Sequence, residues 1–126
     1  MRNGLTFDTG VLVALERRGQ RARALLQRAL EEKIRITVPA AVITEWWRGR
    51  SDAREYVLGG VRIEPLSEQL AKLAGEAIAN VRGATVVDAI VMASAATRGD
   101  IVYTSDVGDL ERLRSYFPSV RVLGIG

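Results

Sequence analysis

The sequence predicts an α/β protein, a three-layer α/β/α sandwich with a mainly parallel five-stranded sheet. Short apolar or β-branched segments alternate with segments of helical periodicity along the chain, and this alternation is typical of right-handed βαβ units whose sheet is covered on both faces. The chain has 126 residues, 48% of them hydrophobic and 26% charged, so we expect a single domain over residues 1–126. Ligands of such sheets bind beyond the carboxyl ends of the strands, near the point where the strand order reverses.

In the N-terminal half, the sequence pattern predicts elements in the order strand 5–7, helix 11–15, helix 22–30, strand 34–38, helix 40–48 and helix 51–58. The strands are short apolar or β-branched runs. Gly19 is expected to end the first helix, and the second carries apolar residues at the spacing of an amphipathic helix. Pro39 ends the second strand and begins the third helix. Ser51 is a plausible N-cap for the fourth helix, which Gly59 and Gly60 close.

The C-terminal half predicts the order strand 61–66, helix 67–81, helix 85–98, strand 101–104, helix 107–116 and strand 120–125. Ser67 and Thr85 stand at the N-cap positions of the first two of these helices, and Gly83 and Gly99 follow their ends. The strand over 101–104 is nearly all apolar, as expected for a strand buried on both faces.

The composition excludes several kinds of catalytic site. Cys and His are both absent, which excludes disulfides, zinc knuckles, Cys nucleophiles, Ser-His-Asp triads and His-ligated metals. The remaining catalytic groups are carboxylates, hydroxyls, Lys and Arg, and carboxylate oxygens suit Mg²⁺ or Mn²⁺.

The charge of the chain favours a nucleic-acid partner. The net charge is +3, and only Lys33 and Lys72 among the 18 basic residues are not Arg, the side chain that matches phosphate in a planar fork. A genome rich in G and C would enrich Arg without any functional reason. The first residues, Met1–Gly4, lack the apolar core of a signal peptide, and no uncharged apolar run is long enough to cross a bilayer. We therefore expect a cytoplasmic protein with no membrane partner.

Acidic residues occur where the predicted strands end or the following helices begin. Asp8 directly follows the first strand, Glu45 lies in the helix after the second strand, and Asp88 lies in the first turn of the most apolar helix. Asp106 follows the fourth strand, and Asp109 lies one helical turn later. Because the carboxyl ends of parallel strands share one edge of a sheet, the predicted topology places these acids near one another.

Each acid also has a purely structural interpretation. Asp8 and Asp106 are good N-cap residues, Thr85-Val86-Val87-Asp88 resembles a capping box, and a Glu on a helix such as Glu45 is usually solvated. Independent caps, however, have no reason to converge at one edge. Carboxylates crowded together repel one another unless a divalent cation neutralises them, so the set as a whole favours an Mg²⁺ or Mn²⁺ site.

Four short motifs surround these acids. They are Leu5-Thr6-Phe7-Asp8-Thr9, Val42-Ile43-Thr44-Glu45, Val87-Asp88-Ala89-Ile90-Val91-Met92-Ala93 and Val102-Tyr103-Thr104-Ser105-Asp106. Taken in this order and spacing, they resemble the motifs of PIN-domain proteins, and specifically of VapC-type toxins from bacterial or archaeal toxin–antitoxin modules. The resemblance covers essentially the whole chain.

The resemblance implies an Mg²⁺- or Mn²⁺-dependent endoribonuclease that cleaves RNA, forms a homodimer and is held inactive by a cognate antitoxin. It assigns the catalytic and metal-binding cluster to Asp8, Glu45, Asp88 and Asp106, with Thr104 as a supporting hydroxyl. Whether Asp106 or Asp109 is the fourth acid stays open, because this spacing varies among related sequences. Gly10 departs from the Ser or Asn often found two places after the first Asp, which puts one supporting hydrogen bond in doubt.

Other features leave partner binding open. Two groups of Arg residues are close in sequence, Arg17, Arg18, Arg21 and Arg23 in the first and Arg48, Arg50 and Arg54 in the second. The first fits a solvated helix face, and the second, next to Glu45, is the better candidate for RNA phosphate. Trp46 and Trp47 point about 100° apart on a helix, so one is expected at a surface, in a dimer or antitoxin interface. The alternative to a nuclease is a PIN-like module that binds RNA or protein with little turnover.

Overall fold

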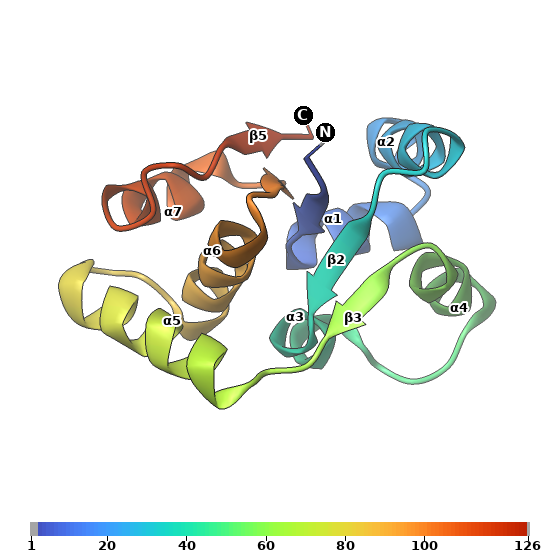
Figure 1. The fold of residues 1–126 in the computed structure, drawn as a ribbon. Coiled ribbons are helices and arrows are strands. Elements are labelled where there is room, and N and C mark those ends of the chain that lie inside the picture. Colours follow the sequence, from blue (N-terminus) through green and yellow to red (C-terminus); the bar gives the residue numbers. More distant parts are fainter. Residues whose placement is uncertain (1–2, 126) are drawn as a thin grey trace.

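The computed structural model describes residues 3–125 and contains the predicted parallel sheet (Figure 1). Its strands are β1 (Leu5–Phe7), β2 (Ile36–Pro39), β3 (Arg62–Glu64), β4 (Ile101–Thr104) and β5 (Val122–Gly124). They form a five-stranded sheet in the order β3-β2-β1-β4-β5, and every neighbouring pair is parallel. Met1, Arg2 and Gly126 lie outside the described residues, so the expectation for the N-terminal segment is addressed only from Asn3 onward.

The helices cover the sheet on both faces, which confirms the three-layer architecture. They are α1 (Thr9–Glu16), α2 (Gln20–Glu31), α3 (Ala40–Trp46), α4 (Asp52–Gly59), α5 (Glu68–Asn80), α6 (Val86–Arg98) and α7 (Val107–Glu111), followed by the 3-10 helix η1 (Arg112–Ser115). The chain moves from β1 outward to β3 and then returns to β4 and β5. Right-handed crossovers therefore place α1–α4 on one face and α5–α7 on the other (Figure 1).

Several elements end at other residues than the sequence pattern predicts. Helix α3 stops at Trp46 rather than residue 48 because Trp47 adopts an extended backbone, with φ −67° and ψ 130°. The predicted helix 107–116 is divided into α7 and the 3-10 turn η1. Gly19 does not end α1, since the left-handed turn falls on Arg18 (φ 62°) and Gly19 is the N-cap of α2.

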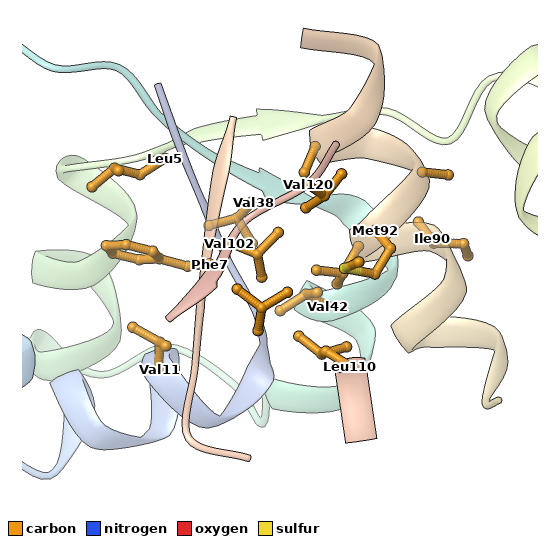
Figure 2. Close-up of a cluster of buried hydrophobic side chains, with 14 of the residues drawn as sticks. Leu5, Phe7, Val11, Val38, Val42, Ile90, Met92, Val102, Leu110 and Val120 are labelled. Carbon is orange, nitrogen blue, oxygen red and sulfur yellow. The ribbon is translucent and has the colours of Figure 1, made fainter. Parts of the chain in front are cut away.

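The hydrophobic core lies on both faces of the sheet. Phe7 and Val11 are fully buried on one side, and Ile90 and Met92 of α6 pack on the other (Figure 2). Helix α6 is buried at every position from Ala89 to Ala95. This helix is therefore the central element of its layer, and its buried stretch begins directly after Asp88. Within residues 3–125, no helix is both long and apolar enough to cross a membrane.

A buried charged network joins α6 to two strands of the sheet, β1 and β3, and the sequence patterns did not predict it. The Arg98 guanidinium donates hydrogen bonds to Asp100 (2.9 Å), Glu64 (2.6 Å) and the hydroxyl of Thr6 (3.0 Å). Asp100, whose side chain is fully buried, also accepts hydrogen bonds from Thr6 (2.9 Å) and Arg35 (3.3 Å). Because each buried charge has a partner of opposite sign, the network clamps the end of α6 onto β1 and β3.

Candidate metal centre

The candidate site lies where the strand order reverses. Strand β1 begins the path that runs outward to β3, and β4, beside β1, begins the path that runs in the other direction to β5. Asp8 follows β1 directly, and Asp106 follows β4 after one residue. These two acids therefore come from the two strands that flank the switch point, the usual ligand site of an open parallel sheet.

Asp8 is both the N-cap of α1 and a member of this site. Its Oδ1 accepts the backbone N–H of Val11 (3.2 Å), and its Oδ2 accepts a hydrogen bond from the hydroxyl of Thr104. Only 9% of the residue is exposed, and this burial is the largest effect, so the pKa of the Asp8 carboxyl is raised above its ordinary value. The hydrogen bonds from Thr104 and Val11 lower the pKa, and the charge of Asp88 raises it. The structural and the functional interpretations of this residue thus apply together.

Glu45 reaches the same edge of the sheet from α3. Its side chain is exposed, and its Oε1 accepts a short hydrogen bond of 2.6 Å from the hydroxyl of Thr9. Thr9 is the first residue of α1, directly after Asp8. This bond links α3 to α1 and holds one oxygen of Glu45 toward the site.

Asp88 is half-buried in the first turn of α6. Its backbone N–H donates to the hydroxyl of Thr85 (3.2 Å), so the predicted cap is present. Burial raises the pKa of the Asp88 carboxyl, a hydrogen bond from Thr85 lowers it, and the charges of three other acids raise it, namely Asp109, Glu45 and Asp106. Asp88 is therefore the acid on which the charges of the others converge.

Thr104 connects the two ends of the site. Its hydroxyl donates to Asp8 and accepts the backbone N–H of Asp106 at 2.9 Å. Asp106 in turn caps α7, with Oδ1 accepting the backbone N–H of Asp109 at 3.4 Å. Both Asp106 and Asp109 lie near Asp88, and the charge of Asp109 has the larger effect on the pKa of Asp88. The structure thus keeps both as candidates for the fourth acid.

The donor set fits a hard divalent cation in its chemistry. It consists of carboxylates without Cys or His, and Mg²⁺ and Mn²⁺ prefer such oxygen donors. Among residues 3–125, no three acidic side chains stand close enough together to hold an ion as they are placed. Glu45, Asp106 and Asp109 are exposed, so their side chains have room to turn toward Asp8 and Asp88.

Comparison with protein families identifies the fold built around these acids. A family model described as the PIN domain matches residues 5–115, which include every acid of the candidate site. The chain belongs to the PIN domain family. No curated protein matches it.

Solved structures resemble this PIN domain over nearly its whole length. DNA-bound VapBC from Salmonella typhimurium contains a chain with a TM-score of 0.74 and 17% identity, the match covering 99% of this chain and 100% of that one. VapBC2 from Rickettsia felis, bound to a promoter DNA fragment, matches with a TM-score of 0.74 and 15% identity, and the match covers 95% of this chain and 97% of that one. A toxin–antitoxin complex from Klebsiella pneumoniae matches with a TM-score of 0.68 and 16% identity, and the match covers 98% of each chain. At these identities, the likeness shows a shared fold.

Gly10 of this PIN domain has a steric explanation. A Cβ at residue 10 would lie 1.7 Å from Oγ and 2.8 Å from Cβ of Ser105. The Ser105 side chain, from the segment after β4, therefore occupies the volume that a side chain at position 10 would fill. The sequence offered no signal for this exchange, because the two residues are distant along the chain.

The second Arg group is not uniformly available for RNA. Arg54 forms an ion pair with Glu16 (3.0 Å), which also accepts a hydrogen bond from Nε1 of the buried Trp46 (2.8 Å). Arg48 donates from Nη1 to the backbone carbonyl oxygens of Thr44 (3.4 Å) and Trp47 (2.7 Å) at the end of α3. Arg54 thus has a structural role in this PIN domain, whereas Trp47 stays partly exposed, in line with the expected divergence of the two indoles.

Proposed function

We propose that this protein is a metal-dependent endoribonuclease and the toxin of a toxin–antitoxin module. The observation that carries the proposal is the gathering of Asp8, Glu45, Asp88 and Asp106, with Asp109, at the switch point of the sheet. A chain without Cys or His has few other ways to cleave a phosphodiester. The folds of the matching VapBC chains support a toxin, since those proteins are toxin–antitoxin complexes.

A bound Mg²⁺ or Mn²⁺ would activate water for attack on a phosphodiester and stabilise the leaving oxygen. Asp8, Asp88 and Asp106 are the residues that would hold one or two such ions, directly or through water, with Asp109 as the alternative to Asp106. Thr104 holds Asp8 by a hydrogen bond, and this orients the carboxylate before any ion binds. In-line displacement at this site would leave a 5′-phosphate and a 3′-hydroxyl.

Glu45 is the residue that would orient or deprotonate the attacking water. Its carboxylate is exposed on the solvent side of the cluster, and Thr9 restrains one of its oxygens. The other oxygen accepts no hydrogen bond from the described residues, which leaves it available to a proton of water. Thr9 is therefore a positioning residue for Glu45.

The partners of the proposed toxin are an RNA substrate, a cognate antitoxin and a second copy of the chain. The proposed toxin acts in the cytoplasm. The matching VapBC and toxin–antitoxin structures favour an antitoxin partner. The partly exposed Trp47, which directly follows α3, and the exposed Tyr56 of α4 are aromatic side chains of the kind enriched in protein interfaces.

The decisive test is the Asp8→Asn variant with single-stranded and structured RNAs, with Mn²⁺ or with EDTA. We expect Mn²⁺-dependent cleavage by the unmodified chain and a loss of about 100-fold or more in the variant, because one oxygen of a metal-binding carboxylate is replaced. Asparagine can still cap α1, so the circular dichroism spectrum should not change. Asp52→Asn, at an exposed position in the first turn of α4, is the matched control and should cleave normally. Equal cleavage by the Asp8→Asn variant would refute the assignment.

A module that binds RNA or protein with little turnover is the second candidate. The observation that favours it is that Asp8 and Asp106 each cap a helix, a structural role that needs no metal. Calorimetric titration with Mn²⁺ separates the two functions. A nuclease requires metal uptake that is lost in Asp8→Asn, whereas a binding module requires RNA or protein binding that EDTA does not change.

A further inference from the structure

Arg112 lies at the rim of the acid cluster, although no sequence motif drew attention to it. It is the first residue of η1, directly after α7. Its Nη2 lies 3.7 Å from Oδ1 of Asp109, and its Nη1 donates to the backbone carbonyl oxygen of Gly83 at 3.3 Å. The guanidinium therefore bridges α7 and the loop that leads into α6.

The Gly83 loop holds this guanidinium closely. Gly83 has a φ of 81°, and a Cβ at this residue would lie 2.6 Å from Nη1 of Arg112. The side chain of Arg112 thus packs directly against the backbone, two residues before Thr85 caps the helix that carries Asp88. A guanidinium held by a backbone carbonyl loses less freedom on binding a ligand than one on a mobile side chain.

The charge of Arg112 is only weakly satisfied within the described residues. Its distance to Asp109 exceeds that of a hydrogen bond, and its side chain is 46% exposed, so this pair is a weak surface ion pair. By contrast, Arg98 has its guanidinium surrounded by partners. A guanidinium carries five N–H donors, and within residues 3–125 the Arg112 guanidinium makes one hydrogen bond, to Gly83. Arg82, next to Gly83, is also exposed and has no ion pair within residues 3–125.

We propose that Arg112 binds a phosphate of the RNA strand beside the phosphodiester at the acid cluster. The inference rests on the proposed ribonuclease function and names a substrate-binding residue for it. A polyanion approaching several carboxylates is repelled, and a fixed guanidinium next to Asp109 offsets this repulsion at the point where the strand must pass. The planar fork of Arg matches a phosphate, which would replace the distant Asp109 carboxylate as its partner.

The test measures RNA binding separately from cleavage. A labelled single-stranded oligonucleotide is titrated into the full chain carrying Asp8→Asn, at several salt concentrations, with and without Arg112→Met. Loss of one phosphate contact lowers the slope of log affinity against log salt by about 0.7 for a single strand. We expect this decrease, together with a several-fold loss of affinity that is similar for oligonucleotides of different sequence. Arg112→Lys, which keeps the charge, should retain the slope.

Arg121→Ala is the matched control, because it also removes one exposed positive charge. Arg121 immediately precedes β5, and so lies at the opposite edge of the sheet from the site. Arg121→Ala should leave the slope of log affinity against log salt unchanged. If Arg112 only supports the Gly83 loop, Arg112→Met would lower the affinity and the melting temperature without changing the slope, and that result would overturn the proposal. Equal effects of Arg112→Met and Arg121→Ala would overturn it as well.

The outcomes also separate this inference from the function beneath it. If the unmodified chain cleaves RNA and Arg112→Met leaves the salt slope intact, only the role of Arg112 is wrong. If the unmodified chain neither cleaves nor binds RNA, the proposed function fails and the role of Arg112 fails with it. If RNA is bound with the expected slope change but is never cleaved, the phosphate contact stands and the nuclease function is wrong.

Discussion

At the scale of single residues, hydroxyl groups prepare the carboxylates of the site. Thr104 donates to Asp8, and Thr9 donates to Glu45, so each acid has one oxygen directed by a neighbouring threonine. These bonds join segments 96 and 36 residues apart in the sequence. They restrain the carboxylates before any ion binds, which reduces the reorganisation that ion binding requires.

Removal of the Asp88 charge should stabilise the protein when no metal is bound. Its pKa is raised above the ordinary value of 3.8, so the folded state holds the proton more tightly than the unfolded state. The free energy of unfolding of the unmodified chain in EDTA therefore falls as the pH rises from about 3.8 through the raised pKa. We expect Asp88→Asn to melt a few degrees higher than the unmodified chain at neutral pH in EDTA.

Thermal unfolding followed by circular dichroism across the acid and neutral range checks this expectation. The advantage of Asp88→Asn should disappear below the ordinary carboxyl pKa, because the unmodified side chain is then neutral in both states. Asp52→Asn, which changes an exposed carboxylate, provides the comparison. A lower melting temperature for Asp88→Asn at neutral pH in EDTA would contradict the repulsion that we describe.

At the scale of elements, the packing of α1 against the segment after β4 depends on one missing side chain. Gly10 leaves the volume that Ser105 fills, with a Cβ at residue 10 lying only 2.8 Å from Cβ of Ser105. This contact brings the start of α1 and the end of β4 together. Gly10 lies two residues after Asp8, and Ser105 directly precedes Asp106, so the contact lies beside both acids.

Gly10→Ala should destabilise the protein by about 1–3 kcal/mol, because the new methyl group overpacks against Ser105. In a Ser105→Gly background the same change should instead stabilise, since Ala is favoured over Gly inside a helix by roughly 0.5–1 kcal/mol. Urea unfolding of the two single variants and the double variant measures this change of sign. A Gly10→Ala effect that is the same in both backgrounds would show that the two side chains do not compete for space.

At the scale of the whole molecule, a network of buried charges holds α6 to the sheet. The Arg98 network connects α6, β1 and β3 through buried ion pairs. Exposed pairs such as Arg28 with Glu32 (2.8 Å) lie on the surface of a single helix or turn. The two kinds of pair should differ strongly in their contribution to stability.

Asp100→Ala should lower the free energy of unfolding by about 3–5 kcal/mol, because it removes the fully buried carboxylate of the network and leaves Glu64 as the remaining acidic partner of Arg98. Arg28→Ala, which removes a pair whose Arg is 80% exposed, should change the free energy of unfolding far less, because solvent screens this pair. Urea unfolding of both variants tests the contrast. Similar losses for the two would mean that the network does not hold the layers together.

Metal binding should be visible as stabilisation of the whole fold. A ligand at about 100 times its dissociation constant stabilises by about 2.7 kcal/mol, and for a chain of this size each kcal/mol shifts the melting temperature by roughly 3–5 °C. We expect Mn²⁺ to raise the melting temperature of the unmodified chain and EDTA to reverse the rise. Asp8→Asn and Asp88→Asn should show little of this shift. An equal shift in these variants would place the ion elsewhere.

Local patterns in the chain were enough to predict the elements and the fold class. Helical spacing, the caps at Ser51, Ser67 and Thr85, and β-branched runs are local signals, and the structure confirms the elements they predicted. Errors fall at element ends, as at Trp47, where the local pattern continues but the backbone turns into an extended conformation. Local propensity does not decide such ends, because tertiary packing outweighs it.

Contacts between side chains of different elements became known from the folded chain alone. The sequence predicted that the acids converge, but it could not show that Asp109 acts more strongly than Asp106 on Asp88, or that Arg112 reaches Gly83, 29 residues away. Ser105 in the space beside Gly10 is a third example. The physical reason is that periodicity and capping act within a few residues, whereas distances between side chains of different elements are set by how the layers pack.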